Sequence, residues 1–193
     1  CFFASFSANS AQNPPSSSWY ESFSPKVQEY LLQNKTYVKS DVQSNDKTQS
    51  FSFVVAGVHK KKCSKAMAII SNYKDYYQYI DFIKHSNYTN GRINLKLSAK
   101  LLPFDMILNF AIPIIKNEGK YQFIFDNGFL KNLTGVVTVE SINNHKKYKC
   151  LIGINANWQG NKTKIPDTIF ELFTATIGQR GLEKLFRLSG HQY

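Results

Sequence analysis

The sequence contains few of the residues that mark a metal site, a disulfide scaffold or a catalytic centre. Three cysteines, Cys1, Cys63 and Cys150, are too few for a disulfide framework and lack the spacing of zinc ligands. Four scattered histidines show no ligand spacing either, and each is most simply interpreted as a surface residue. No Ser/His/Asp or Cys/His group has a recognisable catalytic spacing. We therefore expect no metal, no cofactor and no catalytic residue.

Long apolar runs and acidic residues are also scarce. No stretch reaches the roughly 18 apolar residues that a membrane-spanning helix needs. Lys and Arg number 24 against 13 Asp and Glu, a formal net charge of +11. This excess favours an anionic partner, although a solvated basic surface explains it equally well. Because the lysines mostly alternate with apolar residues, without a nucleic-acid-binding motif, we expect no nucleic-acid partner.

The first twenty residues carry no charge and are rich in Ser, Asn, Ala and Pro. They could be the end of a signal peptide, with an apolar Phe2-Phe3 pair before a small-residue zone at 8–11. Alternatively, Cys1 is the lipid-modified first residue of a lipoprotein, or the stretch is a cloning remnant. The first two interpretations place the protein outside the cytoplasm. We predict a periplasmic or otherwise exported protein with a tail at 1–23, outside the core, and one domain at 24–190.

Helical and strand signals alternate in the first part of this domain. Ser24 and Pro25 are typical of a helix start, and apolar residues at helical spacing predict two short helices further on. The predicted elements before residue 84 are a helix at 24–32, a strand from residue 36, a strand at 51–59, and short helices at 62–70 and 75–83.

From residue 84 onward the apolar residues recur every second position. Asn90-Gly91 is a hairpin signal, and the strands predicted on either side of residue 103, at 92–101 and 104–114, each have one apolar face. A sheet of this kind is covered on one side only. Further strands are predicted at 121–125, 133–142 and 148–158.

The last segment, from Pro166 to Ser189-Gly190, is predicted to be the longest helix, with a broad apolar surface. Gly178 and Gly181 lower its helical propensity and indicate a kink or a close approach of the sheet. Only this helix is long enough to cover the apolar face of the sheet. We therefore predict an α+β fold, a curved antiparallel sheet wrapped around a long C-terminal helix, with two short helices after the first core strand.

Side chains that fail to meet between such a sheet and helix leave a cavity suited to an apolar guest. The alternative is that the same residues fill a solid core. The residues predicted to line the cavity are Met106, Leu108, Phe110, Phe123, Phe125, Ile169 and Phe173.

This order of elements, over about residues 26–188, resembles the helix-grip superfamily of START lipid-transfer domains, polyketide cyclases, birch-pollen-allergen-like proteins and coenzyme-Q-binding proteins. Residues 72–79 (NYKDYYQY) are similar to its D-Y-x-x-Y region, with Asn72 where Asp is usual. Residues 128–135 (GFLKNLTG) are similar to its G-x-f-k-x-l-x-G-x-W strand, with Val137 where Trp is frequent. Ile165-Pro166 is similar to the start of its last helix, and residues 29–38 resemble an extra element of exported bacterial members.

The resemblance implies a monomeric, non-enzymatic carrier of a lipid, a quinone or another apolar molecule. Two alternatives stay open: an enzyme of the cyclase or hydrolase kind, and an interaction module without a ligand. An enzyme would need a cavity-facing acid or base. The polar residues on the predicted inner faces are Tyr121, Ser141 and Tyr148, while the acidic residues fall on outer faces or at strand ends.

The resemblance also implies that the first strand of the sheet runs antiparallel to the last. Cys63, just after the first strand, then lies near Cys150 at the start of the last. In an exported protein the two could pair, and two free buried thiols are the alternative.

A further expectation concerns the loop tips at one end of the sheet, where apolar residues stand beside lysines. Such tips suit shallow contact with an anionic membrane, unless they fold inward and cap the core. The residues predicted to touch the membrane are Leu102, Phe129, Leu130 and Lys131, next to the start of the last helix at 162–165.

Overall fold

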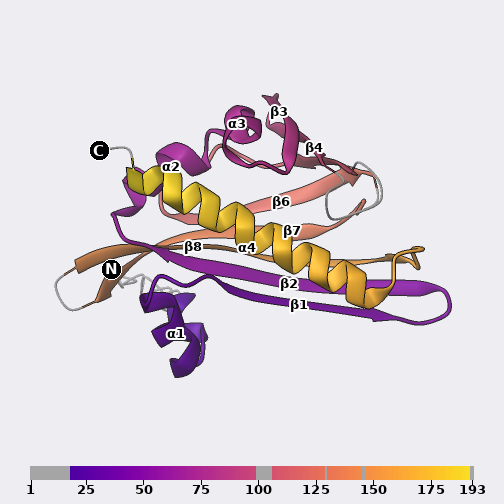
Figure 1. Ribbon diagram of the computed structural model, residues 1–193, viewed down its shortest axis with the longest axis horizontal. Coiled ribbons are helices and arrows are strands. Elements are labelled where there is room, and N and C mark those ends of the chain that lie inside the picture. Colours follow the sequence, from indigo (N-terminus) through magenta and orange to yellow (C-terminus); the bar gives the residue numbers. More distant parts are fainter. Residues whose placement is uncertain (1–17, 99–105, 129, 145–146, 192–193) are drawn as a thin grey trace, which may run out of the picture.

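The computed structural model describes residues 18–98, 106–128, 130–144 and 147–191, which form one antiparallel sheet crossed by a long helix (Figure 1). Of the helices described, none combines the length and hydropathy needed to span a bilayer. In chain order the elements are η1 (Tyr20–Ser22), α1 (Pro25–Leu32), β1 (Tyr37–Ser44), β2 (Thr48–His59), α2 (Cys63–Ile70), η2 (Tyr73–Asp75), α3 (Tyr76–Tyr79), β3 (Ile83–Thr89), β4 (Arg92–Leu97), β5 (Met106–Ala111), β6 (Gly119–Asn127), β7 (Thr134–Asn144), β8 (Lys147–Asn161) and α4 (Asp167–His191).

The eight described strands follow the order β1-β2-β8-β7-β6-β5-β4-β3, so β1 lies at one edge and β2 pairs inside the sheet with β8, the last strand of the chain. β2 pairs with β8 along its whole length, from Thr48 opposite Asn161 to His59 opposite Cys150. Helix α4 runs along β1 and β2 on the inner face of the sheet (Figure 1). The predicted α+β fold, with short helices after the first core strand, is confirmed.

Two contacts explain how α4 lies so close to the sheet. At its start, the Asp167 carboxylate accepts hydrogen bonds from Ser44 Oγ (2.6 Å) and Gln49 Nε2 (2.7 Å). At its middle, a Cβ on Gly178 would lie 2.3 Å from Cζ of Phe53. A glycine is therefore required where α4 crosses β2, as its position in the sequence indicated.

The second predicted short helix, at 75–83, is present but shorter than predicted. Only the single turns of η2 and α3 form, and Ile83 already begins β3. Apolar spacing alone could not separate these states, because Ile80 and Ile83 are buried in the extended chain as they would be on a helix face. β-branched and aromatic residues, which fill this segment, favour extended structure.

The sheet was predicted to be covered on one side only, but part of its outer face is covered as well. Leu31 of α1 packs there against Ala56, Val58, Ile142 and Leu151, and Trp19 and Tyr20 join this second cluster. The Trp19 backbone N–H also donates to the Glu140 carboxylate at 2.9 Å. The prediction that residues 1–20 stay outside the core is therefore wrong for the last of them, and the folded unit begins before residue 24.

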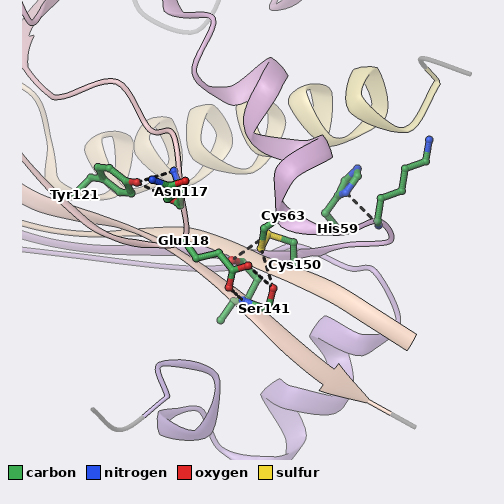
Figure 2. The surroundings of a disulfide bond; sticks show 9 residues. His59, Cys63, Asn117, Glu118, Tyr121, Ser141 and Cys150 are labelled. Carbon is green, nitrogen blue, oxygen red and sulfur yellow. Dashed lines mark hydrogen bonds between the residues drawn. A yellow bond between two sulfur atoms is a disulfide. The ribbon is translucent and has the colours of Figure 1, made fainter. Parts of the chain in front are cut away.

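The cysteine pair is joined in the structure. Cys63, the first residue of α2, forms a disulfide with Cys150 of β8, with the two Cα atoms 4.8 Å apart (Figure 2). Ser141 Oγ lies 3.7 Å from the Cys63 sulfur and donates to the Glu118 carboxylate at 2.6 Å. Of the two alternatives for these cysteines, the disulfide is the one that the structure contains.

Candidate ligand-binding cavity

A cavity of about 290 Å³ lies between the inner face of the sheet and α4. Its walls come from β2, from β3 to β8, from the segment around η2 and α3, and from the middle of α4. Alternation along each strand places every second apolar side chain on this inner face. Aromatic rings supply much of the wall, and the rings of Phe110 and Phe125 stack with their centroids 4.8 Å apart.

Six of the seven predicted lining residues do face this cavity. They are Met106, Leu108, Phe110, Phe123, Phe125 and Phe173. Ile169 is wrongly placed by the prediction, because its side chain is 44% exposed. On α4 the inner face instead passes through Phe170, which is 1% exposed, Phe173 and Ile177. The helix has apolar residues on both sides here, so spacing alone did not decide which side faces the sheet.

Three hydroxyl groups stand among the lining residues, and each has a partner in the protein. Tyr73 donates to the carbonyl of Pro113 at 3.0 Å, and Tyr76 donates to the carbonyl of Ile70. Thr174 donates to the carbonyl of Phe170 at 2.8 Å and lies 2.9 Å from Ser40 Oγ. Burial raises the pKa of both tyrosines far above the usual phenol value, so both stay protonated. Among the described lining residues there is no carboxyl, imidazole or thiol.

Two of the three polar residues predicted on the inner faces, Tyr121 and Ser141, do not line the cavity. Tyr121 bonds through its hydroxyl to the backbone of Asn117, and Ser141 bonds to Glu118 beside the disulfide (Figure 2). The side chain of Tyr148 lies outside the described residues. Within the described chain, no three His, Cys, Asp or Glu side chains come together as metal ligands would.

The same arrangement occurs in solved structures of low sequence identity. A START superfamily protein from Mycobacterium smegmatis superposes with a TM-score of 0.58 at 10% identity, over 74% of this chain and 99% of that one. The chain has the START-like helix-grip fold. XoxI from Bacillus cereus (TM-score 0.55, 12% identity, 72% and 96% covered) and an uncharacterized protein from Bacillus thuringiensis (0.54, 12%, 72% and 98%) are also similar. No family model and no curated protein matches the sequence.

One residue that was predicted to touch a membrane lines the cavity instead. Leu130 is 6% exposed and lines the cavity wall, so its predicted membrane contact is wrong and this part of the tip folds inward. The turn places Leu130 inside because Asn132 adopts a positive φ of 69° and its N–H bonds back to Phe125. Lys131 is exposed, while Leu102 and Phe129 lie outside the described residues.

The sequence analysis did not predict all residues of the cavity wall. Phe51, Phe53 and Val55 of β2 face it, as do Tyr73 and Tyr76. The first three alternate along the chain in the same way as the residues that were found, so the pattern was available. The two tyrosines belong to the stretch that resembles the D-Y-x-x-Y region, but their inward direction depends on the turn at η2, which the periodicity did not reveal.

Proposed function

We propose that the protein binds an apolar small molecule inside the cavity and carries it without changing it chemically. The observation that supports this most directly is the lining, which is apolar except for three hydroxyls that already have partners within the protein. A polar group buried there would lose its hydrogen bonds to water and find no partner in the wall. The fitting guest is therefore hydrocarbon-like: an acyl or isoprenoid chain, a quinone tail or an apolar ring system.

The size of the cavity supports an occupant. An engineered apolar cavity of about 150 Å³ stays dry and takes up benzene, and this one measures about 290 Å³. A guest that fills this space covers the apolar side chains that line it, and burying apolar surface is favourable by about 25 cal/mol per Å².

A binding role fits the chemistry of the wall better than catalysis. General acid or base catalysis needs a group whose pKa lies near the working pH. The two phenols facing the cavity have strongly raised pKa values and already donate their protons to backbone carbonyls. We accordingly propose a carrier rather than a cyclase or hydrolase.

We also propose that the carrier works in an oxidising compartment, as an exported protein. The Cys63–Cys150 disulfide supports this, because such bonds persist in the periplasm and outside cells and are rare in the cytosol. Lipid attachment at Cys1 stays a proposal for the same protein.

Native mass spectrometry of the gently purified protein tests the binding proposal. We expect a one-to-one complex with an apolar molecule, which organic extraction removes. The extracted protein should then bind the neutral dye N-phenyl-1-naphthylamine with increased fluorescence, and the original guest should displace the dye. If the purified protein carries no guest and the extracted protein binds no dye, the proposal fails.

A further inference from the structure

The first half of α4 turns an aliphatic surface toward solvent. Leu172 is 66% exposed and Ile169 is 44% exposed, and their spacing of three residues puts them on one helix face. Phe170 and Phe173, their immediate neighbours in the chain, point the other way and are buried. The apolar surface therefore lies on the side of α4 that faces away from the sheet.

Four exposed lysines belong to segments that meet near the start of this helix. Lys162 and Lys164 come just before α4. The Lys162 backbone N–H donates to the carbonyl of Lys47 at 2.9 Å, so Lys47 lies beside Lys162. Lys131 joins them near the end of β8, where its carbonyl accepts a hydrogen bond from the Trp158 indole at 2.9 Å.

The nearby acids offset part of this charge. Asp167 at the start of α4 already accepts hydrogen bonds from Ser44 and Gln49, which lower its pKa. Asp46, in the turn before Lys47, is exposed. Glu171, next to Leu172 on α4, accepts a hydrogen bond from the Val42 N–H at 2.9 Å. These three acids stand against four lysines at this end of the sheet, so a positive excess remains and an anionic partner has the complementary charge.

We propose that this surface, made of Ile169, Leu172, Lys47, Lys131, Lys162 and Lys164, docks on an anionic lipid bilayer. Ammonium groups are attracted to a layer of anionic headgroups, and aliphatic side chains beside them bury in the interface. A bilayer provides both the anionic headgroups and the apolar interface, and it needs no shape complementary to the protein. Docking in this way needs no guest in the cavity, so it is independent of the proposed carrier function.

Co-sedimentation with vesicles tests the role of the charges. Full-length protein should bind vesicles of equal parts phosphatidylglycerol and phosphatidylcholine at low salt, and bind pure phosphatidylcholine far less. Each lysine near such a surface contributes about a fivefold change, so Lys162→Gln with Lys164→Gln should lower the partition coefficient about 25-fold. The matched control, Lys26→Gln with Lys60→Gln, removes the same charge from exposed positions elsewhere. When both pairs are compared at about 0.1 M ionic strength, it should have much less effect, because salt then screens charges beyond about 10 Å.

A second pair of variants tests the aliphatic contact. Leu172→Ser should lower binding about fivefold or more, because the lost side chain no longer buries in the interface. Ile107→Ser is the control, since Ile107 is similarly exposed, at 52%, on the outer face of β5. Circular dichroism melting should show that all variants fold.

Three results would overturn the proposal. One is no binding to anionic vesicles at low salt. Another is an equal loss of binding in both lysine pairs, which means diffuse attraction by net charge. The last is wild-type binding both in Leu172→Ser and in the Lys162/Lys164 variant. That result would mean that this surface binds another partner, such as an acidic protein.

Discussion

Ala156 offers a way to fill the cavity with a single substitution. It lies on β8 with its small side chain at the cavity wall, 3% exposed and opposite Phe53 of β2. Ala156→Phe should place a ring in the space of a guest and weaken binding of N-phenyl-1-naphthylamine by more than about tenfold, or 1.4 kcal/mol.

The control for this substitution is Ala111→Phe, because Ala111 pairs with Ile124 and shares its outer face. Fluorescence titration should give unchanged affinity for the control. Equal affinity in the two variants would mean that the dye binds elsewhere.

His59, expected at the surface, is instead buried at 3% exposure where β2 meets the end of α4. Its Nδ1 accepts the Lys61 N–H at 3.2 Å, so the remaining proton is on Nε2, which lies 2.9 Å from Ser189 Oγ. The ring also meets Phe186 edge to face. Burial lowers the His59 pKa, and the charge of Lys61 acts in the same direction.

This lowered pKa predicts a loss of stability in mild acid. The unfolded state takes up a proton near the usual histidine pKa of about 6.5, while the folded state resists it. The stabilisation is therefore complete above that pH, and it falls as the pH drops from the unfolded pKa toward the folded one. Urea unfolding near pH 7.5 and near pH 5 should show a larger decrease for the wild type than for His59→Gln. Equal decreases would assign the pH dependence to other groups.

At the scale of elements, the strands were the most predictable part of this protein. Alternation over six or more residues identified the strands from β4 to β8, since only extended chain buries every second side chain. The ends were less predictable: β5 stops before Pro113, which cannot donate to the ladder. Beyond it the burial phase shifts, so that Ile112 and Ile115 are buried and Ile114 is exposed.

In the candidate site, too, the strand residues were predictable and the helix and turn residues were not. Strand residues such as Phe123 and Phe125 were placed correctly, because a sheet has only two faces. Ile169 and Leu130 were not: Ile169 is exposed, and Leu130 lines the cavity. A helix with apolar residues all round, and a turn whose direction depends on one positive φ, leave the direction of a side chain to tertiary contacts.

The attachment of α4 to the β1–β2 hairpin depends on Gln49, which is 1% exposed. Its Nε2 donates to Asp167 at 2.7 Å, and its Oε1 accepts from Thr163 at 2.8 Å. Gln49→Leu leaves both partners without this bond, so we expect a loss of about 1–3 kcal/mol in the free energy of unfolding. The exposed Gln159→Leu serves as the control and should change stability little. Chemical denaturation of both variants measures this, and similar stabilities would contradict a structural role for Gln49.

At the scale of the whole molecule, the disulfide encloses most of the cavity wall. Cys63 and Cys150 are 87 residues apart in sequence, and the loop between them includes α2, α3 and the strands from β3 to β7. Closing so long a loop restricts the unfolded chain more than the folded one. The chain-entropy relation gives a stabilisation of roughly 4–5 kcal/mol.

A loss of that size is large for a domain whose total stability is about 5–15 kcal/mol. Cys63→Ala with Cys150→Ala should therefore lower the urea midpoint strongly, and reducing the wild type should do the same. Cys1→Ser leaves the disulfide intact and should unfold as the wild type does, in both oxidised and reduced conditions. If the double variant unfolds at the wild-type midpoint, the bond adds no stability. An unchanged midpoint would also weaken the support that the disulfide gives to the proposed export of the protein.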